Sequence, residues 1–235
     1  MTAKQTIRWV LKPAVFLAAL IPLGLLVQRL LTGNLGADPL KEITNETGLW
    51  TLRLLCITLT VTPLRRLTGW NAAVRFRRML GLFAFFYGTV HFLIFIVADR
   101  LASLNFPSLA EWQTWKALAA SIGEEILKRP YITVGFTSWV CMLALALTST
   151  GGMVRRLGGK RWQQLHRLIY VAAVAGVVHF WWLVKADVRE PQAYAVVVGA
   201  LLVFRLAWWA RTRTRASVAA RAARGGTVRG NAGGG

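Results

Sequence analysis

Three histidines are the residues of this chain best suited to redox or acid–base chemistry in an apolar setting. His91, His166 and His179 each fall within a long apolar run or at its end. An ionisable side chain inside a bilayer is costly, so it is a candidate functional residue. A neutral imidazole is a common axial ligand of haem iron, and the flat apolar porphyrin suits the core of a helix bundle. The histidines therefore indicate either a b-type haem or structural side chains that hydrogen-bond to neighbours.

The spacing of the histidines indicates where haem would lie. His166 and His179 share one expected helix and are about 20 Å apart along its axis. His91 lies about 18 Å from residue 79, where its own expected helix begins, and so at nearly the depth of His179. We expect His91 and His179 to face one haem, and His166 to hold a second near the opposite surface. On an ideal helix His166 and His179 point about 140° apart, which requires tilt or local distortion between them.

Two arginines are expected at nearly the same membrane depth as His166. Arg78 and Arg77 precede His91 by 13 and 14 residues, and His166 precedes His179 by 13 residues. Together with Arg161, they could hold haem propionates or the phosphate of an anionic flavin. The haem at His166 could then be five-coordinate, water-ligated, bound by another group or absent. No Asp, Glu or Lys lies in the core of an expected span, which disfavours a proton-coupled transporter and an acid–base hydrolase.

The composition indicates which elements position these residues. The chain is 55% hydrophobic and 16% charged, with a net charge of +20. Its basic residues form short clusters between apolar runs, which is typical of a multi-pass membrane protein rather than a nucleic-acid binder. We predict an all-α, polytopic membrane helix bundle with about six transmembrane helices, at residues 13–31, 48–64, 79–98, 131–149, 168–184 and 191–210.

The charge distribution predicts the orientation of the bundle. All nine acidic residues fall in the loops opposite the termini, whereas most basic residues fall on the side of the termini. The positive-inside rule therefore places both termini in the cytoplasm. Residues 1–210 are expected to form one haem-binding transmembrane domain, and residues 211–235 a basic, disordered tail near membrane lipid. Residues 109–127 are expected to form a helix, either on the membrane surface or as an ordinary loop helix.

Several short motifs carry a family resemblance. They are LGADP at 35–39, TPL at 62–64, RRMLGL at 77–82, TVH at 89–91, RPYIT at 129–133, ALALTST at 144–150, GKRWQQLH at 159–166, and WLVK at 182–185 after His179. With these motifs the chain resembles the MsrQ/YedZ family over residues 3–210. Members are haem-binding membrane subunits of the bacterial periplasmic protein-methionine-sulfoxide reductase system, in the ferric-reductase-like transmembrane superfamily.

The resemblance implies a b-type cytochrome of the inner membrane. Its electrons would come from the quinone pool or a cytosolic flavin reductase. They would pass to a periplasmic molybdenum-containing methionine-sulfoxide reductase that repairs oxidised proteins and carries the substrate chemistry. His91, His166 and His179 match the family's haem ligands, for one or two haems. The resemblance also implies FMN, but no stretch of this sequence is assigned to it.

Two other functions stay open at this stage. A stand-alone transmembrane ferric-type reductase would act on a small acceptor without a periplasmic partner. Related reductases carry a C-terminal flavin and nicotinamide module, in the place of which this chain has the Arg-rich tail, so we expect a separate donor. A non-redox membrane scaffold or transporter would use the histidines only as structural side chains.

Overall fold

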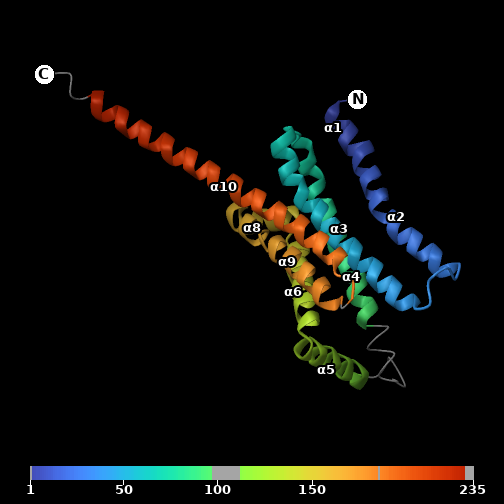
Figure 1. The fold of residues 1–235 in the computed structure, drawn as a ribbon. Helices are drawn as coiled ribbons and strands as arrows, with labels where there is room; N and C mark the ends of the chain where they lie inside the picture. The colour runs from blue at the N-terminus through green and yellow to red at the C-terminus, as the bar shows by residue number, and fades with distance from the viewer. Residues whose placement is uncertain (1, 97–111, 185, 231–235) are drawn as a thin grey trace.

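The computed structural model describes residues 2–96, 112–184 and 186–230 (Figure 1). Throughout these residues the regular structure is helical. The elements are α1 (Ala3–Thr6), η1 (Ile7–Leu11), α2 (Lys12–Leu31), α3 (Pro39–Thr68), η2 (Asn71–Ala73), α4 (Val74–Ile94), α5 (Trp112–Lys128), α6 (Pro130–Leu147), α7 (Gly151–Leu157), α8 (Gly159–Leu165), α9 (Leu168–Leu183) and α10 (Arg189–Gly230).

The fold is an all-α polytopic membrane bundle, as predicted. Among the described residues, five helical stretches are long and apolar enough to cross a bilayer: Lys4–Leu31, Pro39–Thr68, Pro130–Leu147, Gly159–Leu183 and Arg189–Thr214. The remaining expected span corresponds to α4, which has 21 residues, opens with a basic turn and is described as far as Ile94. The sixth crossing therefore stays a prediction, because the end of that span lies outside the described residues.

Helix α3 begins nine residues earlier than the sequence predicts. The Asp38 side chain accepts a hydrogen bond from the backbone N–H of Lys41 at 3.0 Å, and Pro39 occupies the first helical position. Both features favour a helix start, since they satisfy or remove donors that the first turn leaves free. The segment from Lys41 to Glu46, expected as a loop, is therefore helical and belongs to the span.

Helix α10 corrects the prediction of a disordered tail. Its backbone is helical as far as Gly230, through most of residues 211–235. The reason lies in the composition of this stretch, which is rich in Ala and Arg and has no Pro before the helix ends. Ala and Arg are among the strongest helix formers. The domain boundary at residue 210 remains a prediction.

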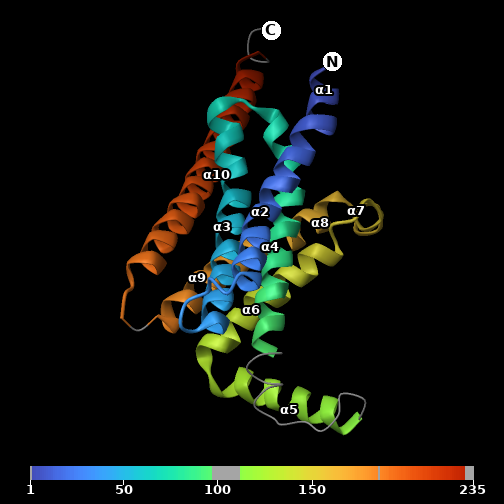
Figure 2. The same ribbon diagram turned by 90° about the vertical axis from the view of Figure 1, so that its right-hand side faces the viewer.

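The core lies where α3 packs on α4 and α6 packs on α9. Its most deeply buried side chains include Leu55, Leu59 and Tyr87, with Ala172 and Ala173 allowing close helix approach. Helix α10 packs against α9 and α3, and α2 lies at the periphery against α3 and α4. Both termini lie at one end of the bundle, and α5 lies across the other end (Figures 1 and 2). Which end faces the cytoplasm remains a prediction.

Tyr87 fastens the peripheral helix α2 to the core. Its hydroxyl donates to the carbonyl of Ala19 at 2.8 Å and accepts from the N–H of Leu23 at 3.2 Å. The side chain thus inserts into the hydrogen-bond ladder of α2 beside Pro22, where a helix is prone to bend. A buried hydroxyl that bridges two helices in this way holds α2 at a fixed distance from α4.

We expect Tyr87→Phe to loosen α2 and to destabilise the protein by about 1–2 kcal/mol, because two backbone groups lose a buried partner. A lower midpoint of thermal unfolding in detergent would show this effect. Phe86→Leu is the matched control, because Phe86 neighbours Tyr87 but is 39% exposed. An unchanged midpoint for Tyr87→Phe would contradict the anchoring role.

Candidate functional site

The structure brings together His91 and His179, the two histidines that are expected at nearly the same depth in the membrane. His91 near the end of α4 and His179 on α9 have ring centroids 6.1 Å apart and ring planes at 81°. A bond from a metal to an imidazole nitrogen is about 2 Å long. Two such bonds, together with the distance from each nitrogen to its ring centre, give a separation of this size. The pair is therefore spaced to share one metal ion.

Backbone carbonyls hold both rings in the tautomer that can bind a metal. Nδ1 of His91 lies 2.9 Å from the carbonyl oxygen of Thr44, and Nδ1 of His179 lies 2.7 Å from that of Tyr131. A carbonyl can only accept, so each Nδ1 must carry the proton and donate it. Nε2 of each ring then keeps its lone pair for a metal. Metal-binding histidines are commonly oriented by such a bond from the second nitrogen.

Both histidines line one cavity of about 850 Å³ between the helices of the bundle, which we call the central cavity. Its walls come mainly from α3, α4, α6 and α9 and are mostly apolar, with Leu52, Leu55 and Trp139 among them. The start of α10 and the segment before it add the charged side chains of Glu190 and Asp187. The volume lies within the usual range of cofactor and ligand pockets. The described residues hold no group of three or more His, Cys, Asp or Glu side chains placed around a metal. Two imidazoles in an apolar cavity suit an iron whose other ligands come from a macrocycle.

Two glycines make room for the imidazole rings. A Cβ at Gly135 would lie 2.6 Å from Nδ1 of His179, and a Cβ at Gly48 would lie 3.2 Å from the ring of His91. The first distance is shorter than real side chains show, so the ring of His179 packs directly on the backbone of α6. Sequence reasoning missed both glycines. Their only signal is a glycine inside an apolar run, which often marks a close backbone approach.

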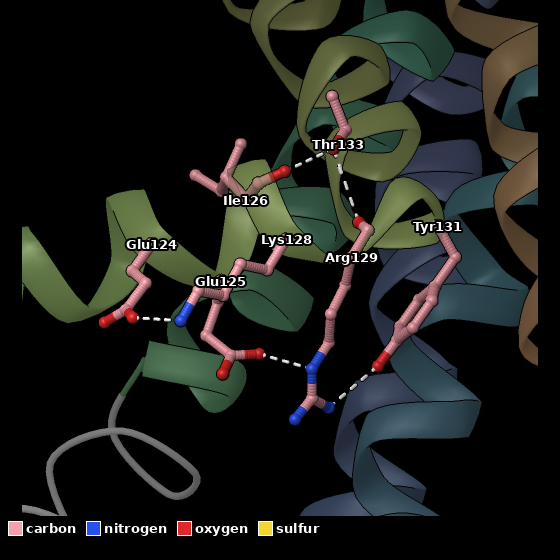
Figure 3. A network of polar contacts seen from close by, with 7 residues as sticks. All are labelled: Glu124, Glu125, Ile126, Lys128, Arg129, Tyr131 and Thr133. Carbon is pink, nitrogen blue, oxygen red and sulfur yellow. Dashed lines mark hydrogen bonds and ion pairs between the residues drawn. The ribbon is translucent and has the colours of Figure 1, made fainter.

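A polar network fixes the corner where α5 meets α6 (Figure 3). Arg129 forms an ion pair with Glu125 at 2.7 Å and donates to the hydroxyl of Tyr131 at 3.1 Å. The hydroxyl of Thr133 donates to the carbonyls of Ile126 and Arg129. This corner matters to the site because the carbonyl that orients His179 belongs to Tyr131. Sequence reasoning recognised Pro130 as the start of the helix but not this network.

The same corner holds an exposed ion pair on α5, between Lys128 and Glu124 (Figure 3). The hydrogen bond between them raises the pKa of Lys128 and lowers the pKa of Glu124. Exposed pairs of this kind contribute little to stability. The pair therefore marks the solvated face of α5 rather than a part of the site.

His166 lies apart from the paired histidines. It ends α8, and a two-residue turn at 166–167 separates α8 from α9. The ring stacks on Trp162 with centroids 3.8 Å apart, and its Nδ1 lies 3.1 Å from the Trp162 carbonyl. Its Nε2 lies 3.5 Å from the hydroxyl oxygen of Ser149. His166 does not line the cavity of the other two histidines.

The structure separates the three predicted arginines from the paired histidines. Arg77 is half-buried in the first turn of α4, close enough to interact electrostatically with His166. Arg78 and Arg161 are exposed. None of the three lines the central cavity. Arg77 therefore lies near His166. The cavity that His91 and His179 share is lined by a different arginine, Arg129.

Comparison with known proteins identifies the family. Residues 47–177 match the family described as ferric reductase like transmembrane component. A relative from Ralstonia nicotianae is 52% identical over 83% of this chain and 84% of its own length. Relatives from Xanthomonas axonopodis pv. citri and Herminiimonas arsenicoxydans are 47% and 46% identical, over 89% and 87% of this chain and 91% and 88% of their own lengths.

All three relatives are named protein-methionine-sulfoxide reductase heme-binding subunit MsrQ. No solved structure gives a significant match. The family resemblance of the sequence motifs is therefore confirmed. The chain belongs to the ferric-reductase-like transmembrane family and, within it, to the MsrQ family.

Proposed function

We propose that the chain is a b-type cytochrome subunit of the bacterial inner membrane. It carries electrons to a periplasmic, molybdenum-containing methionine-sulfoxide reductase that repairs oxidised proteins. The observation that carries the proposal is the His91–His179 pair, 6.1 Å apart in a cavity of about 850 Å³. The names of the relatives support it, because each is called a heme-binding subunit.

His91 and His179 are the residues that would hold the haem. The haem supplies reversible one-electron chemistry at iron. The residues of this chain do the rest: Thr44 and Tyr131 fix the ring tautomers through their carbonyls, and mainly apolar walls surround the pair. Leu52, on α3, is buried and forms part of that wall.

The position of the pair within the bundle supports transfer across the membrane. His179 contacts the carbonyl of Tyr131 at the start of α6, next to α5, whereas His166 lies before the start of α9, at its other end. Helix α5 and the chain termini lie at opposite ends of the bundle (Figure 2). With the termini in the cytoplasm, the haem at His91 and His179 lies on the periplasmic side. A second haem at His166 would lie on the cytoplasmic side, with Arg77, Arg78 and Arg161 to hold propionates or an FMN phosphate.

The proposed donor is the quinone pool or a cytosolic flavin reductase, and the reduction of methionine sulfoxide takes place on the periplasmic partner. The direct test uses the haem-loaded chain in lipid vesicles, reduced beforehand with a limiting amount of dithionite. Adding the partner and methionine sulfoxide together should reoxidise the chain. Reoxidation by methionine sulfoxide without the partner would favour a stand-alone reductase. No reoxidation with both present would contradict the proposal.

A variant of His166 tests how many haems the chain holds. We expect His166→Ala to leave the haem at His91 and His179 in place, because His166 does not line that cavity. If His166 holds a second haem, the variant loses half of the haem that is bound per chain. Haem content measured with protein concentration, for wild type and variant in parallel, distinguishes the two cases. Loss of all haem in the variant would contradict the separation of the two sites.

A further inference from the structure

A second cavity, separate from the central cavity, lies between α2 and α3. Its volume is about 380 Å³. Helix α2 provides an apolar wall that includes Ile21 and Leu25, and α3 provides Glu46, Trp50 and Arg53. We call it the α2–α3 cavity. None of the residues that line it also lines the central cavity, so it is a different site from that of the paired histidines.

The α2–α3 cavity is reached from the bilayer. Ile21 is 57% exposed and Leu25 is 54% exposed, although both belong to a helix that is apolar enough to span a membrane. Apolar side chains exposed on a membrane-spanning helix face lipid. A molecule that enters the cavity from this side diffuses within the membrane, which favours a lipid over a water-soluble ligand.

Two residues of opposite charge line the α3 side of the cavity. Glu46 and Arg53 are seven residues apart, which puts them on one face of the helix and about 10 Å apart along its axis. Both are half-buried. Because a charged side chain in a membrane-spanning segment is costly, the pair indicates a functional site.

The two charges do not neutralise each other directly. Among the residues that the structure describes, the side chain of Glu46 forms no ion pair and no hydrogen bond. The guanidinium of Arg53 lies 4.9 Å from the centre of the Trp50 ring, and its Nε donates to the hydroxyl of Tyr194 at 3.2 Å. Its two Nη groups make no hydrogen bond to the described part of the chain. The cavity thus offers carboxylate acceptors and guanidinium donors at the same time.

The third charged residue of the cavity already has a partner. Arg29 at the rim forms an ion pair with Glu42, and Oε2 of Glu42 accepts from the N–H of Gly36 at 2.7 Å. The charges that remain for a ligand are those of Glu46 and Arg53. A purely anionic headgroup would be repelled by Glu46, and a purely cationic one by Arg53. A headgroup with one charge of each sign complements both.

The order of these charges along α3 matches the order of the groups in a zwitterionic phospholipid. The connection between α2 and α3 lies at the end of the bundle where α5 lies (Figure 2). Glu46 is closer than Arg53 to the start of α3, and so closer to the membrane surface at this end. In such a lipid the ammonium is outermost, the phosphate lies below it, and the acyl chains extend inward.

Helix α2 supplies a surface for the acyl chains. The ion pair between Arg29 and Glu42 sets the level of α2 against α3, and the two helices run in opposite directions. Leu17 precedes Arg29 by 12 residues, and Arg53 follows Glu42 by 11, so Leu17 lies at about the depth of Arg53. Leu17 is 63% exposed. An apolar surface therefore continues inward from the position expected for the phosphate.

We propose that the α2–α3 cavity binds one phospholipid whose headgroup carries a phosphate and a primary ammonium, as in phosphatidylethanolamine. The Nη groups of Arg53 donate to the phosphate, and the carboxylate of Glu46 accepts from the ammonium. A choline headgroup has no N–H to donate to Glu46, and the Trp50 ring that could attract it already contacts Arg53. The site is independent of the proposed function, because its residues lie outside the central cavity.

A comparison of headgroups is the first test. The purified full chain is freed of lipid in detergent, and native mass spectrometry measures its binding of phosphatidylethanolamine, phosphatidylcholine and phosphatidylglycerol with identical acyl chains. We expect the first to bind at least about tenfold more tightly than the other two, since each of them lacks the charged donor for Glu46. Equal binding of all three, or tightest binding of phosphatidylglycerol, would overturn the proposal.

Polar variants test the two assigned contacts separately. Glu46→Gln should weaken the binding of phosphatidylethanolamine about tenfold and leave that of phosphatidylcholine unchanged, because only the primary ammonium donates to Glu46. Arg53→Gln should weaken the binding of both lipids about tenfold, because both carry the phosphate. If Glu46→Gln changed the binding of the two lipids equally, the assignment of the ammonium to Glu46 would be wrong.

Filling the cavity tests its location. Leu25→Trp places a large ring in the α2–α3 cavity, whereas Leu30→Trp places the same ring on α2 at a position that is 52% exposed and lines neither cavity. Far-ultraviolet circular dichroism should show the same helix content in both. A lipid that binds the folded state raises the midpoint of thermal unfolding. Phosphatidylethanolamine should raise the midpoint of wild type and Leu30→Trp but not of Leu25→Trp, and an equal rise in both variants would overturn the site.

Discussion

His91→Ala and His179→Ala are each expected to abolish the same haem absorption band, because the affinity of their shared site for haem should fall at least about tenfold below wild type. The reason is that both rings, with centroids 6.1 Å apart, would hold the same iron. Removing either ring leaves one ligand in a cavity shaped for two. Losses of 10–100-fold already follow from disturbing residues that only support metal ligands. The measurement is the reduced-minus-oxidised visible spectrum of the detergent-purified variants.

Two comparisons make this result specific. His166→Ala changes the same residue type on the same span and should keep the band, since His166 lies outside the cavity. Far-ultraviolet circular dichroism should show the same helix content in all three variants. If His91→Ala or His179→Ala retained a wild-type band, the pairing of the two histidines would be wrong.

Gly135→Ala is expected to produce a comparable loss without touching a ligand. The new Cβ would lie 2.6 Å from Nδ1 and 2.9 Å from Cε1 of His179. It belongs to the backbone of α6, so the ring must move, and it then loses its hydrogen bond to the Tyr131 carbonyl at 2.7 Å. A histidine freed from this bond has neither a fixed tautomer nor a fixed direction. We expect haem affinity to fall by about 10–100-fold.

A series of glycine variants provides the control. Gly24→Ala should be neutral, because no atom lies within 4 Å of the added Cβ. Gly48→Ala should have an intermediate effect, because its Cβ would lie 3.2 Å from the His91 ring. Haem titration of the apoprotein gives the affinity of each variant. If Gly135→Ala binds haem as tightly as Gly24→Ala, the ring of His179 is not held against α6 as the structure shows.

The fold class and the histidine pairing could be predicted from the sequence because both depend on regular geometry. Apolar runs longer than a bilayer is thick define membrane helices, whatever their packing. A rise of about 1.5 Å per residue then gives the depth of each histidine. The estimate holds for His91 and His179 because α4 and α9 are continuous at these positions.

The start of α3 shows where the sequence reading failed. Charged residues between Lys41 and Glu46 lower the apolar content of this segment, so the sequence predicts the span only from Gly48 onward. The Asp38 cap and Pro39 override that composition locally and begin the helix at residue 39. This difference hid Thr44, whose carbonyl orients His91.

Contacts between distant segments could not be predicted at all. Gly135 and His179 meet because α6 and α9 pack together, and no local pattern in either segment specifies that contact. The same is true of the carbonyl of Tyr131, which any residue type could supply. These interactions are set by the backbone and by helix packing rather than by residue identity. A single sequence therefore gives the candidate histidines but not the groups that orient them.

The reduced-minus-oxidised visible spectrum of the wild-type chain, with haem quantified per chain, tests the central claim most directly. The protein should be purified in detergent from cells that are replete with haem. The account predicts a b-type α-band and at least about one haem per chain, held by His91 and His179. A colourless chain with intact helix content would contradict it, and the two facing histidines would then be structural side chains of a membrane bundle.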